Sequence, residues 1–184
     1  MLIKKINCLY KFLIIFFFIS PINNSHAEFF KDISNIIEIN ETRLSYGVSV
    51  TDINTDGNNE FVVTGFGYPN LALSYIDGEL KNIIQEEIFL DRDRKTIGVA
   101  ACDLDKDGFE EIYFLNTDTY SGAKKYSDRL IDKNNNNFFD LFELKKNREN
   151  LNLTAGRSVV CVDRKGEGEY GIYVANYGGR SKLS

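Results

Sequence analysis

An aspartate-rich turn between two apolar segments recurs three times along this chain, and this repeat constrains the fold more than any other feature. The three turns open at Asp52, Asp103 and Asp163, which lie 51 and 60 residues apart. The flanking segments are near-continuously apolar and rich in β-branched and aromatic residues, as expected of strands buried on both faces. Each unit is therefore predicted to begin as two strands joined by an acidic, glycine-containing turn.

A second pair of strands is predicted after each of the first two turns. In the first unit, residues 71–75 predict a short strand, Asp77-Gly78 a tight turn, and residues 80–84 the returning strand. In the second unit, the asparagine-rich segment 133–137 is the corresponding turn. Two strands around the acidic turn and two in the hairpin make a four-stranded unit.

A four-stranded unit that recurs every 40–60 residues or so is typical of a β-propeller blade. We therefore predict an all-β fold, with a plain β-sandwich of irregular strands as the alternative. Propellers close with about four to eight blades, so this chain is expected to be the N-terminal part of a longer protein or an open piece. The prediction is an incomplete β-propeller of about three four-stranded blades, at roughly residues 46–90, 96–145 and 155–184.

The amino terminus has the composition of an export signal. Three lysines at positions 4, 5 and 11 precede the apolar run 12–19, and Ser25-His26-Ala27 provides small residues for cleavage. The run is shorter than the 20 or so residues that span a membrane, although an uncleaved anchor is the alternative. We expect a signal peptide at residues 1–27 and a mature chain, 28–184, that is secreted, periplasmic or at the cell surface.

Charge and histidine content exclude several classes of function. The chain has 22 basic and 27 acidic residues, and residues 28–184 carry a net charge of −8. This acidity argues against a nucleic-acid partner, because binding phosphates needs clustered Lys and Arg. The only histidine, His26, lies in the predicted signal. The mature chain therefore has no histidine with which to build a Ser-His-Asp triad, a Cys-His pair or a histidine zinc site.

The first two acidic turns have the spacing of calcium-binding loops. Alternate side-chain oxygens can point into a tight loop, glycine at position 6 allows the sharp turn, and a backbone carbonyl at position 7 adds a ligand. An EF-hand would also need a bidentate Glu at position 12, where this chain has Val63 and Phe114, and flanking helices. The predicted ligands of the two Ca²⁺ ions are Asp52, Asn54, Asp56, Asn58 and Glu60 in loop one, and Asp103, Asp105, Asp107, Phe109 and Glu111 in loop two.

The two loops are not predicted to bind equally. Loop two has four carboxylates and loop one has three, so calcium is expected to bind more tightly to loop two. Two solvated turns without metal are the alternative to both sites. Loop three has Lys165 at position 3 and Gly171 at position 9, and is predicted to bind no metal because Lys165 provides its own cation between Asp163 and Glu167.

Two further features leave alternatives open. The series Asp132, Asn134, Asn136 and Asp140 has a similar spacing, but we favour a hairpin turn with asparagines in left-handed conformations. Cys102 and Cys161 occupy related places in two repeats. They are either joined by a disulfide, which an oxidising compartment permits, or are buried free thiols that pack as small hydrophobes.

These repeats resemble the FG-GAP/VCBS repeat superfamily, and more narrowly the cartilage acidic protein family. The matching stretches are GVAACDLDKDG followed by EEIYFLNT within residues 98–117, and AGRSVVCVDRKG followed by IYVANY within residues 155–177. A shorter match lies at residues 68–71, and the resemblance covers roughly residues 46–177. The metal-free form of loop three, Asp-Arg-Lys-Gly, also occurs in that family.

The resemblance implies an exported, calcium-binding propeller that is used for extracellular interaction and has no assigned catalytic residues. Only the two acidic loops are carried over as sites. Later blades, a C-terminal ASPIC/UnbV-type domain and an animal EGF-like module are missing here, so any function they carry is in question. The expected partner is an extracellular protein or glycan of unknown identity, with no stable membrane span after signal cleavage.

The sequence is compatible with three functions. The first is a binding or adhesion module in which calcium is structural and no enzyme activity is present. The second is a glycan-active enzyme with paired carboxylates; its candidates are Asp91 and Asp93, in a run that we otherwise expect to be a solvated charged linker. The third is a truncated product without independent function.

Overall fold

The computed structural model describes residues 30–134 and 137–184 of the 184. Ser34–Ser184 form one compact unit. The predicted signal peptide, residues 1–27, lies outside the described residues, as does Asn136. Within the described ranges, no helix has both the length and the apolar character needed to cross a bilayer.

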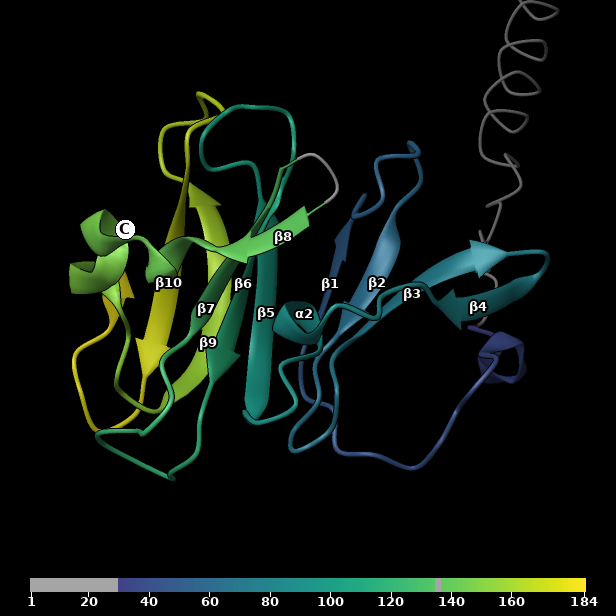
Figure 1. Cartoon of the computed structure of the whole chain (residues 1–184), viewed down its shortest axis with the longest axis horizontal. Coiled ribbons are helices and arrows are strands. Elements are labelled where there is room, and N and C mark those ends of the chain that lie inside the picture. Colours follow the sequence, from purple (N-terminus) through teal and green to yellow (C-terminus); the bar gives the residue numbers. More distant parts are fainter. Residues whose placement is uncertain (1–29, 135–136) are drawn as a thin grey trace, which may run out of the picture. The chain divides into compact units, whose positions relative to one another are not determined.

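The unit consists of three antiparallel sheets, each of which follows chain order (Figure 1). The first is β1 (Val48–Thr51), β2 (Glu60–Val63), β3 (Leu71–Ile76) and β4 (Glu79–Asn82). The second is β5 (Thr96–Cys102), β6 (Glu111–Asn116), β7 (Arg129–Asn134) and β8 (Asn137–Asp140). The third is β9 (Gly156–Asp163), β10 (Tyr170–Asn176) and β11 (Lys182–Leu183). A short helical turn, η1 (Ser34–Ile36), precedes the first sheet. The first and second sheets are connected through α2 (Glu87–Leu90), and the second and third through η2 (Leu141–Glu143) and η3 (Lys145–Asn150).

Sequential meanders of this kind are typical of propeller blades, and the predicted all-β architecture of an incomplete propeller is confirmed. The third sheet differs from the prediction, because its described residues form three strands instead of four. After β10, Lys182 and Leu183 form β11 and pair with Val174 and Tyr173, and Ser184 exchanges two backbone hydrogen bonds with Ile172.

The predicted hairpins form for local reasons. Asp77 and Gly78 both have positive φ, 53° and 89°, as a two-residue turn between β3 and β4 requires. In the second blade, β7 and β8 pair up to Asn134 and Asn137 across the asparagine-rich segment. The described members of the series that begins at Asp132 therefore lie in the paired strands β7 and β8; they are Asp132, Asn134 and Asp140.

The hydrophobic core lies between neighbouring blades, and β6 is its centre. Successive side chains of a strand point to opposite faces of the sheet. Ile112 and Phe114 accordingly pack towards the first blade, whereas Tyr113 and Leu115 pack towards the third. All residues of β6 are buried, as predicted for a strand covered on both faces. The prediction is wrong for β1 and β9, which alternate between covered and more exposed positions.

The innermost strands of the blades approach closely and are cross-linked. A Cβ atom on Gly47, just before β1, would lie 2.9 Å from the Cα atom of Gly98 in β5, which explains the glycine at this repeat position. Cys102 of β5 and Cys161 of β9 form a disulfide, with their Cα atoms 6.2 Å apart. The structure thus selects the disulfide from the two alternatives that the sequence left open.

A buried polar cluster, which the sequence did not predict, ties the second blade to the third. The carboxylate of Asp128 accepts hydrogen bonds from Lys124 Nζ, the Tyr113 hydroxyl, the Asn116 amide and Asn152 Nδ2. Lys124 Nζ also donates to the Asn116 carbonyl, at 2.7 Å. Several polar partners thus compensate for the burial of the Lys124–Asp128 ion pair.

Candidate metal site

Each acidic loop joins the first two strands of its blade, and all three loops share one conformation. The aspartate at position 1 accepts a hydrogen bond from the glycine amide at position 6 in every loop, at 2.8, 3.1 and 2.8 Å. Positions 4 and 6 have positive φ in all three; the residues are Thr55 and Gly57, Lys106 and Gly108, and Gly166 and Gly168. Since loop three has the same geometry, the first aspartate shapes the turn whether or not a metal is present.

In loop one, protein donors already satisfy the carboxylates. Glu60 is fully buried; its Oε2 accepts from the Ile53 amide at 3.0 Å and its Oε1 from the Ser74 hydroxyl at 2.9 Å. Asp56 accepts from the backbone and side-chain nitrogens of Asn58, and the backbone hydrogen bond is the main reason that the pKa of Asp56 is lowered. Asn54 Nδ2 donates to Asp56 Oδ2 at 2.9 Å. Asn54, Asp56 and Asn58 are therefore linked with one another, whereas Glu60 accepts from donors outside the predicted ligand set.

In loop two, three of the predicted ligands converge. Asp103, Asp105 and Glu111 each offer an oxygen, and these oxygens lie within 4.8 Å of one another. Asp107 accepts from the Phe109 amide at 2.8 Å and is not part of this group. Among residues 30–134 and 137–184, this is the only group of three or more acidic, cysteine or histidine side chains with such spacing.

Glu111 is the unusual member of this cluster. It is 1% exposed, and its Oε2 accepts from the Leu104 amide at 2.7 Å, but its Oε1 has no hydrogen-bond partner. Burial, assisted by the nearby charges of Asp105 and Asp132, raises the pKa of Glu111 to about 7. A buried carboxylate oxygen without a donor is costly. A hard cation such as Ca²⁺, which binds oxygen ligands, would satisfy it, so the residues of loop two fit the ion.

Loop three has a different charge arrangement. Gly171 stands at position 9, and Lys165 Nζ lies 3.4 Å from Glu167 and 3.8 Å from Glu169. Asp163 accepts backbone amides, which lower its pKa; the Gly168 amide has the largest effect. Lys165 thus pairs with Glu167 as predicted, whereas Asp163 is satisfied by the backbone.

The series from Asp132 to Asp140 does not converge on one point in its described members. Asp140 accepts from the Phe142 amide at 3.0 Å, where it caps η2, and lies 3.1 Å from Arg129. Asp132 instead lies near loop two: burial raises its pKa, and the charges of Asp105 and Asp107 add to the effect. The sequence analysis did not assign Asp132 to loop two. This neighbourhood follows from the register between β6 and β7, which spacing along the chain does not reveal.

The two carboxylates of the alternative enzyme site, Asp91 and Asp93, have different surroundings. Asp91 is 3% exposed, and its Oδ1 accepts from Arg94 at 2.6 Å and from Arg129 at 2.8 Å. Its Oδ2 accepts from Asn116 Nδ2 at 3.2 Å, whereas Asp93 is exposed. The prediction of a solvated linker is therefore wrong for Asp91, because the neighbouring Arg94 and the distant Arg129 cover it.

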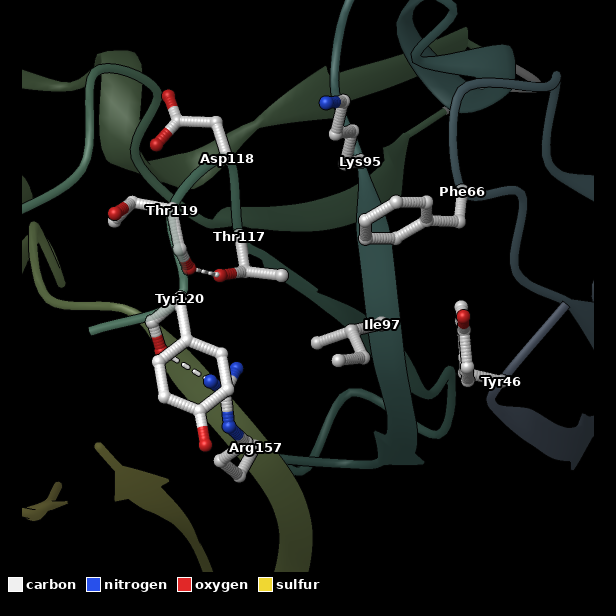
Figure 2. Close-up of a pocket in the computed structure, with 9 residues that line it drawn as sticks. All are labelled: Tyr46, Phe66, Lys95, Ile97, Thr117, Asp118, Thr119, Tyr120 and Arg157. Carbon is white, nitrogen blue, oxygen red and sulfur yellow. Dashed lines mark hydrogen bonds between the residues drawn. The ribbon is translucent and has the colours of Figure 1, made fainter. Parts of the chain in front are cut away.

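A pocket of about 410 Å³ lies near the start of β5 (Figure 2). Figure 2 shows the Arg157 guanidinium beside the ring of Tyr120, to whose carbonyl it donates a hydrogen bond. The guanidinium carbon lies 5.1 Å from the ring centre of Tyr120 and 5.0 Å from that of Tyr177. The pocket combines aromatic, cationic and acidic groups; its lining residues are Tyr46, Phe66, Lys95, Ile97, Thr117, Asp118, Thr119, Tyr120 and Arg157.

Comparisons with known proteins agree with this architecture. The FG-GAP-like repeat family matches residues 24–114, which include both acidic loops. Cartilage acidic protein 1 of Xenopus tropicalis is 49% identical over 149 residues, and that of Homo sapiens 48% over 149 residues; each match covers 75% of this chain. The chain spans only 23% and 22% of these relatives. The chain therefore belongs to the FG-GAP repeat proteins of the cartilage acidic protein family.

Proposed function

We propose that this chain is part of an exported, calcium-binding β-propeller that recognises an extracellular protein or glycan and has no catalytic role of its own. The observation that carries the proposal is the buried, unpartnered Oε1 of Glu111 beside the carboxylates of Asp103 and Asp105. A calcium ion supplies the positive charge that this group lacks. The disulfide between β5 and β9 supports an oxidising compartment.

The proposed calcium role is structural. In loop two the side chains of Asp103, Asp105, Asp107 and Glu111 and the carbonyl of Phe109 would hold the ion, between two strands of the central blade. A ligand that binds only the folded state stabilises it, by about 2.7 kcal/mol at a concentration about 100 times Kd. Calcium would therefore stiffen the blade and hold its loops in place.

A second, weaker calcium site is proposed in loop one. Asp52, Asp56 and Glu60 supply three carboxylates, and Asn54 and the Asn58 carbonyl supply neutral oxygens. Since Glu60 is already satisfied by two protein donors, less is gained when an ion binds here. This is a further reason, besides charge, to expect tighter binding at loop two.

The Arg157 pocket is the proposed contact surface for the partner. Tyr46 and Tyr120 are 60% and 76% exposed, and aromatic rings with fixed polar groups are common in recognition surfaces. The Arg157 guanidinium contacts two tyrosine rings that also pack edge to face on each other, so its orientation is set before a ligand arrives. Loss of glycan or protein binding in an Arg157→Ala variant that still melts normally would support this assignment.

Calorimetric titration of the full chain with calcium tests the central claim. Two binding events of unequal affinity are expected, and EDTA should lower the melting temperature. Asp105→Ala should weaken the tighter event and Asn54→Asp should strengthen the weaker one. Heats of zero together with an unchanged melting temperature in EDTA would refute calcium binding.

A further inference from the structure

The glutamate at position 9 of the acidic loop faces a different residue on the third strand in each of the first two blades. In the first blade, Phe61 pairs with Leu73, so Glu60 at position 9 faces Ser74 on β3. In the second blade, Ile112 pairs with Ile131, and the same antiparallel register brings Glu111 opposite Asp132 on β7. Ser74 and Asp132 thus occupy equivalent places in two blades.

This difference explains why one glutamate is satisfied and the other is not. The Ser74 hydroxyl donates to Glu60 Oε1 at 2.9 Å. An ionised Asp132 accepts hydrogen bonds and has none to donate, and Glu111 Oε1 is left without a partner. The second blade therefore places a carboxylate where the first blade places a hydrogen-bond donor.

The neighbouring lysines do not neutralise the second cluster. Lys133 Nζ reaches the first blade, where it donates to the Ile53 carbonyl at 2.8 Å. Lys106 Nζ pairs with Glu169 at 3.1 Å. Both cations are thus engaged elsewhere, while Asp132 and Glu111 stand together beside the rest of loop two.

We propose that Asp132 is a further ligand of the calcium ion in loop two, and that the residue at this cross-strand position decides how strongly a blade depends on calcium. The inference rests on the proposed function. Ser74 lets the first blade satisfy Glu60 without an ion, whereas Asp132 makes the second blade depend on one. Calcium takes about six to eight oxygens, and a carboxylate from β7 adds to the set that the loop provides and links the loop to the third strand of the blade.

A reciprocal exchange of the two residues tests this proposal on the full chain. Calcium affinity is measured by calorimetry, and melting temperature is measured in EDTA and in calcium. Asp132→Ser should weaken the tighter event by about tenfold or more, because one charged ligand is lost, and should raise the melting temperature in EDTA. Ser74→Asp should lower the melting temperature in EDTA and enlarge the calcium-induced rise.

Two further variants make the result decisive. Asp132→Asn keeps the side-chain size and should also weaken calcium binding, so it replaces Asp132→Ser if that variant does not fold. Asp93→Ser removes an exposed acid outside the loops and should leave calcium affinity unchanged. If the wild type binds calcium and the Asp132 variants bind it within twofold of wild type, only this inference is overturned. A wild type that binds no calcium overturns the proposed function together with it.

Discussion

Substitution of Glu111 by Gln should stabilise the metal-free protein at neutral and alkaline pH. Burial raises the pKa of Glu111 from 4.5 to about 7, so the folded chain binds a proton that the unfolded chain has already released. The unfolding free energy contributed by this group therefore falls as pH rises from about 4.5 to 7. Between pH 4 and pH 8 this contribution to the unfolding free energy falls by about 3 kcal/mol. Glu111→Gln should therefore be more stable than the wild type by that amount at pH 8 in EDTA.

Urea denaturation in EDTA at pH 4 and pH 8 measures this effect. The wild type and Glu111→Gln should have similar stability at pH 4 and should separate at pH 8. In calcium, the wild type should be more stable than Glu111→Gln, because the neutral amide is a poorer ligand than the carboxylate. Glu60→Gln is the matched control: it should bring no gain, since both oxygens of Glu60 accept hydrogen bonds in the folded chain. If Glu111→Gln were no more stable than the wild type at pH 8 in EDTA, the reasoning about an uncompensated buried charge would be refuted.

Three further predictions concern stability in urea. The double variant Cys102→Ala/Cys161→Ala should lose about 4 kcal/mol of unfolding free energy, because the disulfide closes a loop of 59 residues. The reduced wild type is the control and should lose the same amount. An unchanged unfolding free energy would contradict this prediction. Gly108→Ala should cost about 1–2 kcal/mol, because φ is 92° while the space for Cβ is open; a neutral result would show that the turn relaxes. Lys124→Met should lower the unfolding free energy by about 3–5 kcal/mol, because Asp128 stays buried without its cation. The double variant Lys124→Met/Asp128→Leu should recover part of this loss. Equal losses in both variants would contradict the assigned ion pair.

The local features of the fold could be predicted because short segments encode them. The turn at Asp77-Gly78 needs two residues that tolerate positive φ, and this requirement can be read from the dipeptide. The acidic loops are likewise recognisable from the spacing of aspartate and glycine, and loop three keeps the same conformation without the position 9 acid. The number of strands in the third sheet was harder to predict, because β11 is a strand of two residues.

The candidate site was predicted less completely. Spacing predicted which loop residues bind calcium, but it treated Glu60 and Glu111 as equivalent. Their surroundings differ because residues on a neighbouring strand, Ser74 and Asp132, face them. Asp91 was likewise expected to be solvated, and it is covered by Arg129, 38 residues further along the chain.

The sequence by itself determined that this chain forms propeller blades with acidic loops between their first two strands, because periodicity and turn chemistry act over a few neighbouring residues. The tertiary structure decided which carboxylates have donors, which cysteine state occurs, and which strand is buried on both faces. The physical reason is that desolvation and hydrogen bonding depend on groups brought together from distant parts of the chain. The dry, unpartnered oxygen of Glu111 could be recognised only after Asp132 had been placed opposite it.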